Sequence, residues 1–200
     1  QENSFYMTSN SLLKNKNFVL FLSIRWFYSL AIQSITLTVG WQVYILTGNP
    51  LDLGLIGLAQ VLPIFLFILP SGVIADKFDR KVVITLCTMV HLLVAIYLLY
   101  YSLGDPESIW PILAALLVHG TARAMYQPSL NAILPNIVEK KLFPNATAYN
   151  SSVGKLGHLL GPLASGIIIA FYDTKVYFFA IVCLGISTLS TLLLKNPKNS

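Results

Sequence analysis

Long apolar runs separated by short charged segments dominate the sequence. No charged residue interrupts Leu53–Ala75 or Val82–Leu103, and about 20 apolar residues are enough to cross a bilayer as a helix. Membrane strands are about half as long and alternate, and backbone groups in lipid need hydrogen bonds within the segment. The pattern predicts an all-α membrane protein with six transmembrane helices, at about 18–46, 53–75, 82–103, 109–134, 145–172 and 176–194.

Composition and charge point to the same class of protein. Charged residues make up 10% of the 200 residues, apolar residues 56%, and the mean hydropathy is +0.70. With the N-terminus inside, nine basic residues lie in the inner segments and Lys175 alone in the outer loops. The positive-inside rule then predicts a multi-pass inner-membrane protein with both end segments, 1–17 and 195–200, in the cytoplasm. This bias explains the net charge of +5 without a nucleic-acid partner.

The two sets of three predicted helices retain a faint internal repeat. A shift of 94 residues brings Pro50 onto Pro144 and Ser71–Gly72 onto Ser165–Gly166. Because each set crosses the membrane an odd number of times, the two sets must have opposite orientations. The predicted fold is therefore a bundle of two inverted three-helix repeats.

The segment 72–81 places five charges between two apolar runs. Its Gly-x3-Asp-x3-Arg-Lys spacing resembles the loop between the second and third helices of the major facilitator superfamily. Further stretches resemble the branch that contains the macrolide-efflux and enterobactin-export proteins, at 46–60, 126–135, 142–146 and 161–162. The resemblance covers the chain from Lys14 onward. It implies the N-terminal six-helix half of a twelve-helix fold, with a C-terminal half as its partner. Whether the half is natural or cut from a longer protein stays open.

In that family the charged loop is a gating loop that contacts the other half and latches one state of the transporter. The resemblance gives this role to Gly72, Asp76, Lys77, Asp79, Arg80 and Lys81. Asp79 departs from the broader superfamily, which often has glycine at this position. The alternative is a simple positive-inside anchor.

The fifth predicted helix carries small residues at steps of three, four and four, which place them on one face. A proline within the row bends such a helix. This face resembles the antiporter signature of exporters, with a serine in place of one glycine, and a generic packing seam is the alternative. The small residues on this face are Gly154, Gly157, Gly161 and Ser165, and the antiporter-like helix also includes Pro162 and Gly166.

Three basic residues lie within the predicted spans, namely Arg25, Arg123 and Lys155. No acidic residue lies within these spans. A cation in hydrocarbon is costly, so it normally faces a cavity or a partner. Either the missing half supplies carboxylates, or these cations line a cavity that accepts an anionic substrate. Arg25 also lies near enough to the inner end to extend its charge out of the membrane.

Three histidines lie on the third, fourth and fifth predicted helices. His91, His119 and His158 are candidates to carry a coupling proton, because imidazole titrates near neutral pH. The alternative is a hydrogen-bonded contact between helices. Their spacing gives no metal site, and no cofactor is expected.

These features predict a secondary active transporter that exports a small organic molecule of drug, macrolide or siderophore type. The expected mechanism is alternating access with protons as the driving ion. The sequence has no nucleotide-binding loop, so neither ATP-driven transport nor an enzyme activity is expected. The alternatives are facilitated uptake or lipid flipping on the same fold, and a non-transporting half that serves as a membrane subunit.

Overall fold

The computed structural model describes residues 12–104, 106–172 and 175–195, with the backbone alone at 68, 69 and 71–76. Within these ranges it contains helices and no strand, which confirms the all-α prediction. One short 3-10 helix, η1 (Lys140–Leu142), precedes α6. The long helices are α2 (Lys16–Thr47), α3 (Pro50–Lys77), α4 (Arg80–Leu103), α5 (Trp110–Ile137), α6 (Phe143–Tyr172) and α7 (Val176–Leu193).

Side-chain caps fix several helix ends. The Asn15 side chain accepts hydrogen bonds from the backbone N–H groups of Asn17 and Phe18 at the start of α2. Gly48, with φ at 62°, ends that helix in the left-handed conformation that glycine adopts at little cost. At the start of α4, Asp79 accepts a 2.9 Å hydrogen bond from the backbone N–H of Lys81. Such caps satisfy backbone donors that have no partner within the helix.

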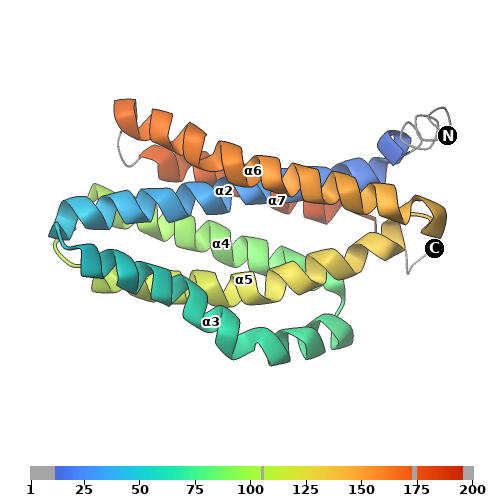
Figure 1. Cartoon of the computed structure of the whole chain (residues 1–200), viewed down its shortest axis with the longest axis horizontal. Coiled ribbons are helices and arrows are strands. Elements are labelled where there is room, and N and C mark those ends of the chain that lie inside the picture. The colour runs from blue at the N-terminus through green and yellow to red at the C-terminus, as the bar shows by residue number, and fades with distance from the viewer. Residues whose placement is uncertain (1–11, 105, 173–174, 196–200) are drawn as a thin grey trace.

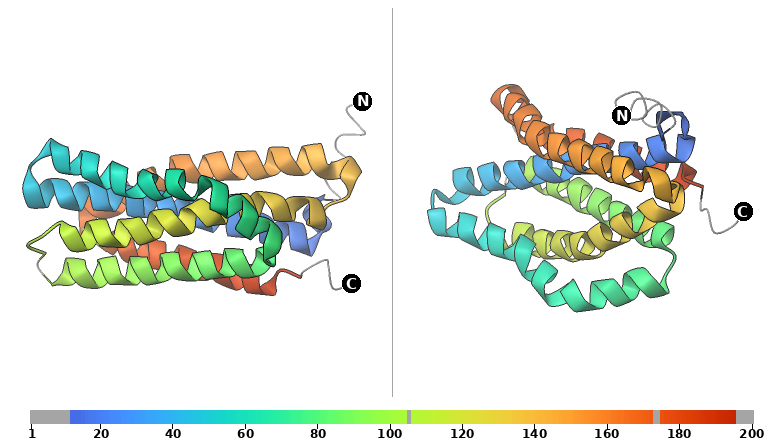
Figure 2. Two further views of the ribbon diagram at one scale, coloured as in Figure 1. Left: turned by 90° about the horizontal axis from the view of Figure 1, so that it is seen from below. Right: turned by 45° about the vertical axis from the view of Figure 1, so that its right-hand side comes forward.

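The six long helices lie side by side, and helices that follow one another in the chain run in opposite directions (Figure 1). The start of α2 and the end of α7 therefore lie at the same end of the bundle (Figure 2). Two hydrogen bonds join them there. The Asn17 side-chain amide donates to the carbonyl of Lys195 at 3.4 Å, and the Lys195 N–H donates to the Asn17 side-chain oxygen at 3.3 Å.

Helix packing follows an internal twofold pairing. α2 packs chiefly against α6 and α7, α5 packs chiefly against α3 and α4, and α4 also packs against α7. If α2, α3 and α4 correspond to α5, α6 and α7, each of these contacts has a counterpart. The α2–α7 contact matches α4–α5, the α2–α6 contact matches α3–α5, and α4–α7 matches itself. This packing is the arrangement that two inverted three-helix repeats require.

Five helical segments in the described part of the chain are long and apolar enough to cross a membrane: Lys16–Thr47, Pro50–Phe67, Arg80–Leu103, Lys140–Tyr172 and Val176–Leu193. The remaining long helix, α5, has 28 residues. It carries a row of polar side chains at steps of four, His119, Arg123, Gln127 and Asn131. The most polar helix of the bundle thus packs directly on α3 and α4.

Candidate functional site

A row of side chains at steps of four runs along α2. Residues four apart form a ridge on the surface of a helix, which packs into the groove of a neighbour. The first three members are polar and the last three apolar. In chain order they are Arg25, Ser29, Gln33, Leu37, Trp41 and Ile45. The ridge therefore changes from polar to apolar toward the C-terminal end of α2.

Glycines of α6 face the polar part of this ridge. A methyl group added to any of three glycines would lie 2.6–2.7 Å from the α2 side chain opposite it. The facing pairs are Gly154 with Arg25, Gly157 with Ser29, and Gly161 with Gln33. One turn further, the buried Ser165 hydroxyl donates to the carbonyl of Gly161 at 2.8 Å. Four members of the predicted antiporter-like face thus lie at or beside the contact with α2.

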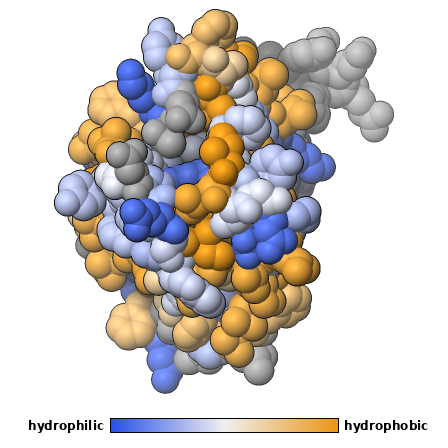
Figure 3. All heavy atoms as spheres, turned by 90° about the vertical axis from the view of Figure 1, so that its left-hand side faces the viewer, coloured by the Kyte–Doolittle hydropathy of each residue, from blue (hydrophilic) through white to orange (hydrophobic). Residues whose placement is uncertain are grey.

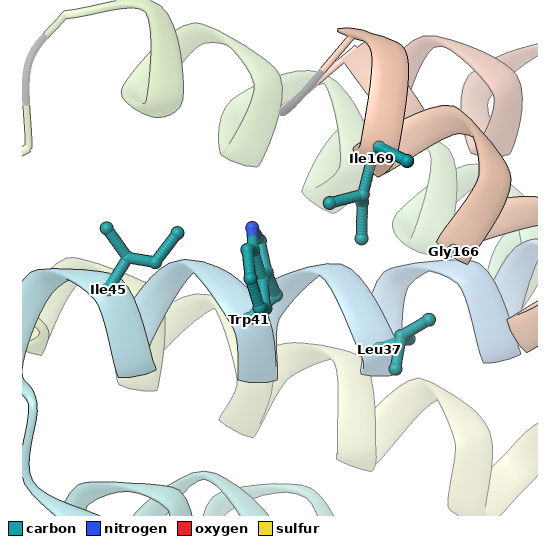
Figure 4. Close-up of a pocket in the computed structure, with 6 residues that line it drawn as sticks. Leu37, Trp41, Ile45, Gly166 and Ile169 are labelled. Carbon is teal, nitrogen blue, oxygen red and sulfur yellow. The ribbon is translucent and has the colours of Figure 1, made fainter.

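Beyond this contact, α2 and α6 separate and a groove opens between them. A methyl group on Gly166 would meet no atom within 4 Å. The groove has a volume of about 640 Å³ and is lined by Leu37, Trp41, Ile45, Gly166, Ile169 and Ala170. In Figure 4 the α2 side chains point to the same side, and Ile169 of α6 points toward Trp41. Pro162 lies in α6 between the contact and the groove.

The groove lies toward the end of the bundle away from the start of α2 and the end of α7. Figure 3 looks at this end and shows polar side chains mixed with apolar ones. The lining residues of the groove itself are all apolar apart from the indole nitrogen of Trp41. An apolar part of a ligand therefore has a complementary surface here.

Polar side chains from three helices meet at the other part of the ridge. The Arg25 Nη1 donates to Oε1 of Gln127 on α5 at 2.9 Å. The side-chain amide of Gln33 forms a hydrogen bond with Nδ1 of His158 on α6. Arg123 lies one helical turn before Gln127 on the same face of α5. We call Arg25, Gln33, Arg123, Gln127 and His158 the basic cluster.

The structure therefore brings together Arg25, Arg123 and His158 of the predicted substrate or coupling residues. Lys155 is exposed on α6, and no hydrogen bond joins it to the basic cluster. Among the described residues, no carboxylate lies within ion-pair distance of Arg25, Arg123 or Lys155.

The two other histidines lie in the core behind the basic cluster, and both are fully buried. The Nδ1–H of His91 donates to the carbonyl of Cys87 at 2.6 Å, and its Nε2 lies 3.4 Å from the Tyr28 hydroxyl. The His119 ring meets the His91 ring edge-on at 4.6 Å, and Tyr28 stacks on Tyr126 at 3.6 Å. This stack joins α2, α4 and α5. No group of three metal-binding side chains occurs in the described part of the chain.

The charged loop ties helices of this bundle together. The Arg80 Nη1 donates to the carbonyl of Ala132 on α5 at 2.6 Å. The Lys81 ammonium donates to the carbonyl of Leu192 at 2.8 Å. Leu192 lies in the last turn of α7, where carbonyls lack partners within the helix and a cation is favourable.

The remaining loop residues have other positions. Asp79 caps α4, and Lys77, the last residue of α3, is exposed. Only the backbone is described at Gly72 and Asp76, so the predicted role of these two residues lies outside what the structure describes. Figure 1 shows that α3, which contains Pro63 and Pro70, bends away from α5 in its second half before it reaches this loop.

Sequence reasoning passed over several residues of the site. Ser29, Leu37 and Ile45 belong to the α2 ridge, and Gln127 is the acceptor for Arg25. The repeat of four along α2 was the available signal, since it continues from Arg25 to Ile45 without a break.

Six long helices with inverted-repeat packing and a polar ridge along α2 are the arrangement expected of a membrane transporter of the major facilitator type. Residues 10–199 match the model of the family described as "Transmembrane secretion effector". The chain belongs to this family of the major facilitator superfamily, which confirms the predicted membership. The family and the relatives below are transporters.

Two relatives resemble this chain over most of its length. The "Staphyloferrin A transporter" of Staphylococcus aureus is 29% identical over 182 residues, which cover 89% of this chain and 43% of the relative. The "Macrolide efflux protein A" of Streptococcus pyogenes is 21% identical over 154 residues, which cover 76% of this chain and 38% of the relative. This chain thus spans less than half the length of either protein.

A solved structure supports the fold. The POT family transporter PepTSo matches with a TM-score of 0.75 and 12% sequence identity. The match covers 90% of this chain and 37% of the transporter. At this identity the likeness concerns the arrangement of helices alone.

Proposed function

We propose that the protein exports a small organic molecule of drug, macrolide or siderophore type by alternating access, with protons as the driving ion. The observation that carries this proposal is the α2 ridge, polar at the basic cluster and apolar in the groove. The names of the two relatives, a siderophore transporter and a macrolide efflux protein, support the substrate class.

The substrate would lie along the ridge. Small-molecule sites are mostly apolar with a few polar groups that fix orientation, and the groove and the basic cluster supply these two parts. The ridge from Arg25 to Ile45 covers 21 residues of helix, which rise about 30 Å. Successive polar and apolar contacts along this length would guide a substrate from one end of the bundle toward the other.

The orientation and the partner half are part of the same proposal. The start of α2 and the end of α7, which lie at one end of the bundle, would face the cytoplasm, because nine of the basic residues lie in the segments at that end. A second six-helix half would pack beside the α2–α6 side and complete the path. The short span of this chain relative to its relatives supports this arrangement.

For the coupling proton we propose His158. It is the exposed one of the three histidines, whereas His91 and His119 are fully buried. Its Nδ1 accepts from the amide nitrogen of Gln33, which can only donate. A proton on Nδ1 would break this bond and release one link between α2 and α6.

The test is transport in proteoliposomes with an imposed pH gradient, with staphyloferrin A and erythromycin as separate probes. We expect at least one probe to accumulate, and accumulation to collapse when nigericin removes the gradient. Accumulation that persists without the gradient would contradict proton coupling. Transport of neither probe would contradict the proposed substrate class.

A further inference from the structure

Two arginines of the basic cluster have few partners. Of the five N–H groups of the Arg25 guanidinium, only Nη1 donates to an acceptor among the described residues, Gln127. The Nε of Arg25 is buried and makes no hydrogen bond there. No hydrogen bond of the Arg123 guanidinium occurs in that part of the chain either. A buried charged donor without an acceptor is unfavourable, so the Arg25 guanidinium calls for a further, negative group.

The two arginines reach the same region from different helices. Arg25 extends from α2 to Gln127 on α5, and Arg123 lies one turn before Gln127 on the same face of α5. Two like charges that share neighbours repel each other in a medium of low dielectric constant. An anion between or beside them would remove this repulsion and fill the free donors at once.

We propose that Arg25 and Arg123 bind a carboxylate-bearing organic anion, so that the substrate's acidic group lies at the basic cluster. This inference rests on the proposed function, because it names the chemical class of substrate for the same ridge. A guanidinium suits the task, since its planar donors match the two oxygens of a carboxylate.

Gly154 is a positioning residue for this site. A methyl group there would lie 2.6 Å from Nε and 2.8 Å from Nη2 of Arg25. Both distances are shorter than any contact that these atoms tolerate, so the guanidinium would have to move. The glycine thus leaves the space through which Arg25 extends from α2 to Gln127 on α5. An alanine would displace the guanidinium from this position without touching the helix backbone.

The test is equilibrium binding of citrate to the purified protein in lipid nanodiscs, measured by calorimetry. Trimethyl citrate is the matched probe without charge. We expect citrate to bind at least tenfold more tightly than the ester, and its affinity to fall with rising salt concentration. Arg25→Gln and Arg123→Gln should each weaken citrate binding at least tenfold. Lys155→Gln, which removes an exposed cation outside the cluster, should change it less than twofold.

Gly154→Ala should weaken citrate binding about as much as Arg25→Gln does. In the Arg25→Gln background it should have no further effect, because the displaced group is already gone. A merely structural role would instead lower the thermal unfolding midpoint in both backgrounds.

Citrate affinity that equals that of the ester, or that survives both arginine substitutions, would overturn the proposal. Binding is measured without transport or a pH gradient, so its outcome is separate from that of the export experiment. A protein that binds citrate but does not transport keeps the anion site and loses the proposed function.

Discussion

The α2–α6 and α3–α5 contacts occupy equivalent places in the two repeats, yet Gly154 in the first and Gly120 in the second face different kinds of atoms. In the α3–α5 contact, a methyl group on Gly120 would lie 2.6 Å from the backbone oxygen of Gln60 and 3.0 Å from Cγ of Pro63. In the α2–α6 contact, a methyl group on Gly154 would meet the guanidinium of Arg25 at the same 2.6 Å. A backbone cannot give way, whereas the end of a long side chain can.

This difference shows how one backbone plan supports two roles. The α3–α5 contact is closed around main-chain atoms and fixes the distance between two helices. The α2–α6 contact holds a movable cation at one part and opens into the groove at the other. Symmetry of the fold thus determines where the helices touch, and the side chains make the α2–α6 contact the proposed place for a substrate.

The largest expected effect is on stability. Gly120→Ala should lower the free energy of unfolding by about 1–3 kcal/mol, because overpacking against backbone forces the helices apart. Gly154→Ala should change it by less than about 0.5 kcal/mol, since only a side chain moves. Thermal unfolding in detergent measures both. Gly185→Ala, where a methyl group meets nothing within 4 Å, is the control. Equal destabilisation by the Gly120 and Gly154 variants would abolish the contrast between the two contacts.

The next effect concerns the coupling proton that we propose for His158. His158→Gln should reduce gradient-driven transport about tenfold, equivalent to about 1.4 kcal/mol, while exchange of substrate without a gradient continues. Glutamine keeps a hydrogen-bonding partner for Gln33 but cannot titrate. His91→Gln should instead act through stability, since His91 is fully buried and bonded to the carbonyl of Cys87. Unchanged gradient dependence in His158→Gln would remove this histidine from the coupling step.

The smallest effect concerns the gating loop at the end of α3. We propose that Asp76 contributes to a latch between the two halves. Asp76→Asn should slow transport about fivefold, equivalent to about 1 kcal/mol, because asparagine keeps a hydrogen-bond acceptor but removes its charge. Membrane insertion should be unchanged, because Asp79 still caps α4 and Arg80 still holds α5. Wild-type flux in this variant would leave the loop as an anchor only.

Features set by a residue's local sequence were predictable. Asp79, in the turn between α3 and α4, caps the N-terminus of α4. Gly48 ends α2 in the left-handed conformation that glycine favours. Apolar runs of sufficient length identify the helices because lipid demands internal hydrogen bonds. The weak repeat at 94 residues predicted the paired packing of the two three-helix repeats.

Features that depend on how helices cross were not predictable. Arg25 and Gln127 are 102 residues apart, and their hydrogen bond requires α2 and α5 to meet at one depth. The sequence predicts that the glycines of α6 form either an antiporter signature or a generic helix-packing surface. Their partner residues on α2 follow only from the packing of the two helices. The loop cations Arg80 and Lys81 likewise bond to carbonyls of helices distant in sequence.

The most direct test of the account closes the α2–α6 groove. In a protein whose two native cysteines are replaced by serine, cysteines at Leu37 and Ile169 would be joined by a short thiosulfonate cross-linker. A matched pair at Leu93 and Ala114 lies in a second apolar groove, between α4 and α5, of about 420 Å³. We predict that the Leu37–Ile169 link stops transport and that a reducing agent restores it, while the Leu93–Ala114 link leaves transport intact. Full transport with the α2–α6 groove linked shut would contradict the account.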